Sequence, residues 1–284
     1  MQGRGNSGGE EYFSEGDTVL SVSKKIRMGF LRKVYGILCV QLTLTALVCA
    51  FAMKATSPIK VEGFNVLSFG SFIAGSGAFA VITFVVSFIV LISLFCVRHS
   101  YPLNTILLGI WTVAMALSVA TACTMAVCDP LVVTPSGVMP LSISKGAISI
   151  AGGAITCATN TEYAVAGGNA VIMAAGIAAS IFLALTAYTL QSRIDFSFLG
   201  AGLFATLWVL VIWGIIMACF GTASPSLQYW YAMIGAIVFG LYIVYDTWLI
   251  SAKMGPDDYI AASISLYLDI INLFLMILQL LRRD

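Results

Sequence analysis

Long, continuous runs of apolar residues alternate with short polar connections along most of this chain. A helix that crosses a ~30 Å hydrocarbon layer needs about 20 apolar residues, and seven runs approach or exceed that length. The runs extend over Val34 to Met53, Phe72 to Val97, Leu103 to Val127, Asn169 to Leu190, Phe196 to Phe220, Tyr229 to Ile250, and Ile260 to Leu281. They are continuous and do not alternate every second residue, so they predict helices and not barrel strands. The predicted fold class is an all-α integral membrane protein with seven transmembrane helices.

Composition agrees with this prediction and divides the chain. Hydrophobic residues make up 60% of the 284 and charged residues only 10%, which is far from the composition of soluble domains. Residues 1–31 are rich in Gly, Ser and Glu and predict a disordered cytoplasmic tail. Residues 32–284 form the predicted transmembrane domain, in which residues 128–168 make a long lumenal or external loop.

The distribution of the fourteen Lys and Arg residues predicts the orientation in the membrane. Cytoplasmic segments carry an excess of these residues. With a cytoplasmic N-terminus, that side would receive Arg4, Lys24, Lys25, Arg27, Arg32, Lys33, Arg98, Arg193 and Lys253, and the other side Lys54, Lys60, Lys145, Arg282 and Arg283. A cytoplasmic N-terminus is therefore expected. The tail at Arg282 and Arg283 disagrees with an odd number of spans, so the last segment either crosses against the rule or enters and returns.

The seven cysteines do not predict a disulfide framework. Five of them lie in or beside the apolar runs, where a thiol usually acts as a small apolar side chain. Cys128 and Cys157 differ because both flank or lie in the long loop on the predicted lumenal or external side. A disulfide between them is the alternative to two free thiols.

Sequence motifs for enzymatic, nucleotide or metal chemistry are missing. Gly75 and Gly77 match part of a dinucleotide-binding pattern, but no strand precedes them and they begin a membrane span. The single histidine, His99, has no Cys or His at zinc-ligand spacing. We therefore expect no enzyme, no cofactor and no nucleic-acid partner.

Two aspartates, Asp246 and Asp269, are the only acidic side chains inside the apolar runs. A carboxylate inside a membrane is costly and is by default a functional site. With a rise of 1.5 Å per residue, Asp246 lies about 6 Å and Asp269 about 14 Å from the same membrane face. The short connection from Ser251 to Tyr259 makes the two helices antiparallel neighbours. The aspartates are therefore expected to meet, unless each binds only a backbone group.

Two neighbouring carboxylates in a medium of low dielectric constant cannot easily both be charged. The pair is expected to titrate as a unit and to act as a proton sensor. Carboxylates are also the hard oxygen ligands that calcium prefers, so Asp246 and Asp269 are candidate transient calcium ligands. Arg98, after the second predicted span, is a candidate counter-charge, although it is equally explained as a flanking cation.

Several short segments around these residues resemble the Bax inhibitor family of membrane proteins, in its lifeguard-like branch. The segments are Tyr245-Asp246, Ser265 to Phe274 (SLYLDIINLF), Arg98 with Pro102-Leu103-Asn104, and Asp195 to Leu199 (DFSFL). The resemblance implies six helices around a central seventh. It also implies that Asp246 and Asp269 form a pH sensor latched by Arg98, in a protein that leaks calcium across endomembranes and restrains cell death.

The resemblance also implies partners and a location. Membrane lipid, calcium ions, protons and cell-death regulatory membrane proteins are the expected partners. The endoplasmic reticulum or the Golgi is the expected compartment, with the plasma membrane as the alternative. The expected function is a pH-sensitive calcium leak channel that regulates calcium homeostasis, stress responses and cell death.

Two other functions are kept as alternatives. A non-conducting membrane scaffold would regulate stress or apoptosis without an ion path. An intramembrane aspartyl protease would also place two aspartates in consecutive spans. However, Leu266-Tyr267-Leu268 precedes Asp269 where a protease has glycines that admit the substrate backbone, and no later span carries the third protease motif.

Overall fold

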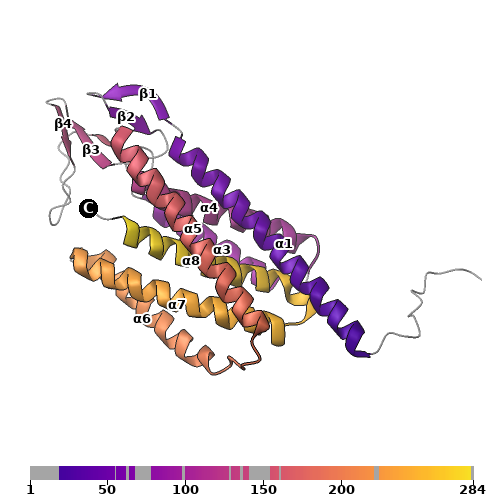
Figure 1. Ribbon diagram of the computed structural model, residues 1–284. Coiled ribbons are helices and arrows are strands. Elements are labelled where there is room, and N and C mark those ends of the chain that lie inside the picture. Colours follow the sequence, from indigo (N-terminus) through magenta and orange to yellow (C-terminus); the bar gives the residue numbers. More distant parts are fainter. Residues whose placement is uncertain are drawn as a thin grey trace, which may run out of the picture.

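The structure, a computed structural model, describes residues 19–54, 56–61, 64–67, 78–97, 100–127, 129–134, 137–140, 154–159, 161–220 and 224–282. These residues form an elongated helical bundle with a small sheet at one end (Figure 1). The helices are α1 (Val19–Lys54), α3 (Ala78–Cys96), α4 (Leu103–Val127), α5 (Thr161–Gln191), α6 (Leu199–Phe220), α7 (Pro225–Ala252), the 3-10 turn η1 (Pro256–Asp258) and α8 (Tyr259–Leu281). Within the described residues, six helices are long and apolar enough to cross a membrane, and Val85–Cys96 of α3 is a shorter apolar helix. The predicted all-α membrane fold is confirmed.

The last helix, α8, is the central one. It packs against α7, α5, α1 and α4. In its apolar 18-residue stretch 56% of the residues are buried, compared with 11% in the corresponding stretch of α6. In contrast, α3 packs mainly against α4, and α6 mainly against α7. Large apolar side chains of α6 such as Phe204, Trp208 and Ile212 are exposed, as expected for a surface that faces lipid. The predicted central seventh helix is confirmed.

Contacts between α1 and α8 show that these helices run in the same direction. The Lys33 ammonium lies 3.3 Å from the ring centroid of Tyr259 at the start of α8. Further along both helices, the hydroxyls of Thr45 and Tyr267 lie 2.8 Å apart. At 1.5 Å per residue, α8 extends about 34 Å without a break. The last segment therefore crosses the bundle and does not return.

The predicted tail, residues 1–31, extends too far, because α1 already begins at Val19. Residues 1–18 lie outside the described residues. The apolar run predicted a helix only from Val34 on, because the preceding segment contains Lys24, Lys25, Arg27 and Arg32. Lys and Arg are nevertheless good helix formers, and Phe30 and Val34 are buried on the same face of α1. Packing of this face thus extends the helix beyond the apolar run.

A small antiparallel sheet lies at the end of the bundle where α1 ends and α5 begins (Figure 1). Its strands are β1 (Thr56–Val61), β2 (Phe64–Leu67), β3 (Asp129–Thr134), β4 (Gly137–Pro140) and β5 (Ala154–Thr159), in the order β1-β2-β5-β3-β4. The sheet thus joins the connection after α1 to the long loop predicted at 128–168. The sheet was not predicted from the sequence, because its strands are short and lie among Gly, Ser and Thr.

The predicted disulfide falls partly outside the described residues, which include neither Cys128 nor the side chain of Cys157. The backbone of Cys157 lies in β5 opposite Pro130 of β3. The disulfide therefore stays a prediction. In the membrane part, Cys49 of α1 and Cys123 of α4 are buried in contact with each other, as expected for small core side chains.

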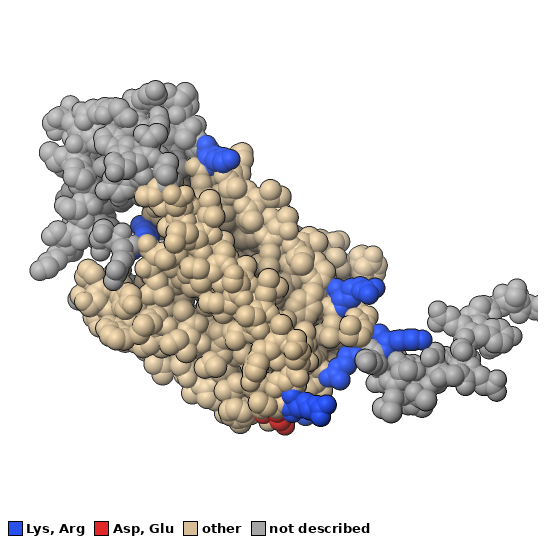
Figure 2. All heavy atoms as spheres, viewed as in Figure 1, with Lys and Arg blue, Asp and Glu red and all other residues tan. Residues whose placement is uncertain are grey.

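Basic side chains gather at one end of the described bundle, with a broad uncharged zone between the ends (Figure 2). Lys25, Arg27, Arg32 and Lys33 lie near the start of α1, and Arg193 and Lys253 follow the ends of α5 and α7. Lys54 and Arg282 lie at the ends of α1 and α8. We call the end with Arg27 and Arg193 the basic end.

Candidate functional site

Asp246 and Asp269 meet at the contact between α7 and α8. A tight connection of Lys253 to Asp258 joins these two helices, which pack along their length. Ser224 caps the start of α7 by accepting a hydrogen bond from the Leu227 N–H, and Pro225 occupies the first turn. The Asp246 and Asp269 side chains are only 9% and 6% exposed. Their carboxyl groups are in hydrogen-bonding contact with each other.

Few polar groups surround this pair. The Asp246 carboxyl is also in contact with the Ser265 hydroxyl, and Oδ2 of Asp269 has no hydrogen-bond partner among the described residues. Tyr242 lies close enough to both carboxyls to interact electrostatically with them. Ser265 lies four residues before Asp269, and Tyr242 four before Asp246, so each shares a helix face with its aspartate. Neither residue was predicted from the sequence, although the four-residue spacing from each aspartate indicates a shared helix face.

The protons available on Ser265, Asp246 and Asp269 limit which of these groups can donate hydrogen bonds. The Ser265 hydroxyl has one proton and donates it to the Ala262 carbonyl over 3.2 Å. A hydroxyl can rotate, however, and at its contact with Asp246 it can donate this proton to an ionised carboxylate instead. A direct hydrogen bond between the two carboxyl groups requires one shared proton. The geometry therefore suits a pair with one negative charge.

The pair does not by itself form a resident metal site. Among the described residues, no group of three or more His, Cys, Asp or Glu side chains could hold a metal ion. Calcium takes six to eight oxygen ligands, and the pair with Ser265 offers only side-chain oxygens from three residues. These groups fit a passing ion better than a bound one.

Arg98, the predicted latch, lies outside the described residues. The structure therefore brings together Asp246 and Asp269, two of the three predicted site residues. The roles predicted for all three remain predictions.

A second polar network, which sequence analysis missed, lies between α1, α4 and α8. Tyr267 is fully buried, with its hydroxyl at 2.8 Å from the Thr45 hydroxyl and its ring edge-on to Trp111 at 5.4 Å. Gln41 donates from Nε2 to Thr112 Oγ1 over 3.0 Å, while its Oε1 has no partner among the described residues. Polar side chains thus lie on two faces of α8, one toward α7 and one toward α1 and α4.

Comparisons with known proteins agree with this architecture. The family model described as Inhibitor of apoptosis-promoting Bax1 matches residues 27–168 and 146–284. The chain is 36% identical to the Golgi anti-apoptotic protein of Vaccinia virus (strain Lister) over 273 residues, 96% of this chain and 92% of the relative. It is 35% identical to Protein lifeguard 4 of Mus musculus over 272 residues, with the same two coverages. It is also 30% identical to Bax inhibitor 1 of Schizosaccharomyces pombe over 271 residues, 95% of this chain and 82% of the relative.

The matches extend over nearly the whole chain, including the α7–α8 hairpin that holds the two aspartates. Together with the central seventh helix, they place the chain in the Bax inhibitor family of membrane proteins, in its lifeguard-like branch.

Proposed function

We propose that this protein is a pH-sensitive calcium leak channel of endomembranes that regulates calcium homeostasis and restrains cell death. The single observation that carries the proposal is the contact of Asp246 and Asp269 beside the central helix, with one carboxylate oxygen unpartnered among the described residues. A titrating group next to the contact between α7 and α8 couples protonation to helix packing. The names of relatives, such as Golgi anti-apoptotic protein, support the link to cell death and a Golgi location.

The mechanism follows from the charge of the pair. Ionised Asp246 and Asp269, bridged to Arg98, hold the second, sixth and seventh spans together at one mouth of the bundle. Protonation removes the charge that Arg98 binds and loosens this contact. The same carboxylate oxygens are hard ligands for a passing calcium ion, so protonation also weakens the ion site. The leak therefore need not vary monotonically with pH.

Calcium-dye liposomes that contain the purified chain test the proposal across a pH series. Asp269→Asn removes one of two coupled titrating groups, so most of the pH dependence of calcium flux should disappear. Asp246→Asn should act in the same direction. Asp257→Asn is the matched control, because Asp257 is an exposed carboxylate in η1, in the same hairpin. A wild-type pH profile in Asp269→Asn would refute the sensor, and no flux from the wild-type chain would favour the non-conducting scaffold.

An intramembrane aspartyl protease is less well supported. Leu266 and Tyr267 are fully buried within the bundle, which leaves no path for a substrate backbone along this part of α8. A protease would also need both carboxylates accessible to a water molecule and a peptide. Binding of an aspartyl-protease transition-state analogue, with loss of a cleavage activity in Asp246→Asn, would reverse this ranking.

A further inference from the structure

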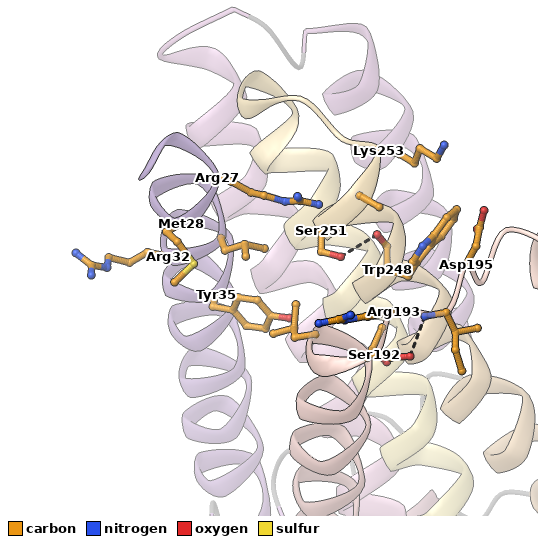
Figure 3. Close-up of a pocket in the computed structure, with 15 residues that line it drawn as sticks. Arg27, Met28, Arg32, Tyr35, Ser192, Arg193, Asp195, Trp248, Ser251 and Lys253 are labelled. Carbon is orange, nitrogen blue, oxygen red and sulfur yellow. Dashed lines mark hydrogen bonds between the residues drawn. The ribbon is translucent and has the colours of Figure 1, made fainter. Parts of the chain in front are cut away.

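A pocket of about 1040 Å³ opens at the basic end of the bundle. Its walls are the early turns of α1, the end of α5 with the loop that follows, and the last turns of α7 (Figure 3). The walls combine cationic and apolar side chains: Arg27, Arg32, Arg193 and Lys253 line the pocket together with Met28, Leu31 and Leu190. It is separate from the carboxylate pair, which is not among its lining residues.

Two guanidinium groups are directed into this pocket. Figure 3 shows Arg27 and Arg193 extending inward from different walls, whereas Arg32 and Lys253 point away from the pocket. Neither Arg27 nor Arg193 has an ion-pair or hydrogen-bond partner within the described part of the chain. The helix dipole at the end of α5 accounts for a cation at Arg193, whereas Arg27 lies inside α1 and is otherwise explained only by the positive-inside rule.

The acidic side chain at the rim does not neutralise these cations. Asp195 is exposed, and its Oδ1 accepts a hydrogen bond from the Ser197 backbone N–H over 2.9 Å. This hydrogen bond lowers the pKa of the Asp195 carboxyl. Asp195 thus turns toward its own loop at the start of α6, and the pocket keeps an excess of positive charge.

Three hydroxyl groups lie together beside the pocket, within reach of one another. They belong to Tyr35 of α1, Thr186 of α5 and Thr247 of α7, and Thr186 and Thr247 are 8% and 1% exposed. The three side chains are near neighbours, and Tyr35 also lines the pocket. Of the three, only Tyr35 lines the pocket, so its hydroxyl is the one suited to a ligand that carries hydroxyl or phosphate oxygens.

The location favours a lipid over a soluble anion. The pocket lies where α5 and α7 end, and Trp248 on its wall is typical of the boundary between membrane and water. Met28, Leu31 and Leu190 supply an apolar side against which an acyl chain or glycerol backbone can pack. A soluble polyphosphate would leave this apolar side uncovered.

We propose that this pocket binds the phosphorylated headgroup of an anionic phospholipid, of the phosphoinositide type. Arg27 and Arg193 would bind a phosphate through paired N–H donors, the arrangement in which arginine binds phosphate best. The Tyr35 hydroxyl would contact the polyol ring. The occupant would link α1, α5 and α7 at the membrane boundary.

The test titrates the purified full chain in neutral detergent micelles and measures bound lipid by native mass spectrometry. The probes are dioctanoyl phosphatidylinositol 4-phosphate, dioctanoyl phosphatidylcholine and free inositol 1,4-bisphosphate. The phosphoinositide should bind at least about tenfold more tightly than either of the others, because charge-assisted hydrogen bonds and apolar contact both contribute. Equal binding of phosphatidylcholine would overturn the proposal, and equal binding of the free headgroup would assign the pocket to a soluble anion instead.

Variants of the two inward arginines localise the site. Arg27→Gln and Arg193→Gln should each weaken phosphoinositide binding about tenfold. Arg32→Gln is the matched control on the same helix and should change binding less than about twofold, since its side chain points away. An equal loss in Arg32→Gln would mean that only the general surface charge is sensed, and the site would be refuted.

Two further variants separate binding from loss of the fold. Arg27→Lys keeps the charge but not the paired donors, so affinity should fall between the wild type and Arg27→Gln. Tyr35→Phe keeps the approximate shape and removes the hydroxyl that lines the pocket, so it should reduce the preference for the phosphoinositide over phosphatidic acid. Retention of the full preference in Tyr35→Phe, with a wild-type elution volume, would refute the contact to this hydroxyl.

Discussion

Asp269 lies deep in the bundle with one carboxylate oxygen that has no partner among the described residues. Buried polar groups are normally satisfied, and a buried charge that remains unpaired is costlier still. A cation is therefore the partner that an ionised pair would require. Arg98, which lies outside the described residues, is the predicted source of this cation.

Replacement of Arg98 tests the latch. Arg98→Ala would remove the cation that favours ionised carboxylates, so calcium leak should increase at neutral pH toward the level that the wild type shows in acid. Arg98→Lys should restore only part of the wild-type profile, because a point charge replaces a planar group with paired donors. The measurement is calcium flux in dye-loaded liposomes across a pH series. If Arg98→Ala changes neither flux nor pH dependence, Arg98 is only a flanking cation that sets topology.

At the scale of elements, hydrogen bonds help to join α1 to the central α8. Thr45 donates its one hydroxyl proton to the Gln41 carbonyl over 2.9 Å. The Tyr267 hydroxyl must then be the donor in its 2.8 Å contact with Thr45. This hydrogen bond links helices that are far apart in sequence, in an environment where no bulk water competes.

A double-mutant cycle measures this link. Tyr267→Phe and Thr45→Val each remove one side of the hydrogen bond at nearly constant shape, and each should destabilise the bundle. The coupling energy between them should be about 0.6 kcal/mol, the average found for interhelical hydrogen bonds in a membrane protein, and no more than the maximum of about 1.7 kcal/mol. Reversible unfolding in a denaturing detergent supplies the four stabilities. Thr43→Val on the exposed face of α1 is the control and should show no coupling to Tyr267→Phe.

Helix positions were largely predictable from the sequence, but the structures at the ends of the bundle were not. The predicted limits of α4, Leu103 to Val127, agree with the structure because a continuous apolar run ends sharply on both sides. Helix rise and a short connection were enough to bring Asp246 and Asp269 together. The sheet and the pocket depend on segments distant in the chain, such as α1 with α5 and α7, and no local pattern reports such contacts.

At the scale of the whole molecule, the direction of the helices fixes the relation between the two ends of the chain. The start of α1 and the start of α8 share the basic end, and α8 crosses the bundle to the end that carries the sheet (Figure 1). The start of α1 and the end of α8 therefore lie at opposite ends of the described bundle. The positive-inside rule predicts that the basic end is cytoplasmic.

Cysteine labelling tests this topology as a set of linked outcomes. Single cysteines are placed at Ser7, Ser144, Ser251 and Asp284 in a background in which the seven native cysteines are replaced. An impermeant thiol reagent applied from the lumenal or outer side should spare Ser251→Cys, because Ser251 lies at the basic end, and Ser7→Cys, because the positive-inside rule predicts a cytoplasmic N-terminus. The same reagent should label Ser144→Cys in the long loop and Asp284→Cys beyond α8. Labelling of Ser251→Cys from that side would invert the orientation, and with it the compartment whose pH Asp246 and Asp269 would sense. Protection of Asp284→Cys would instead mean that the end of α8 does not reach the far side of the membrane.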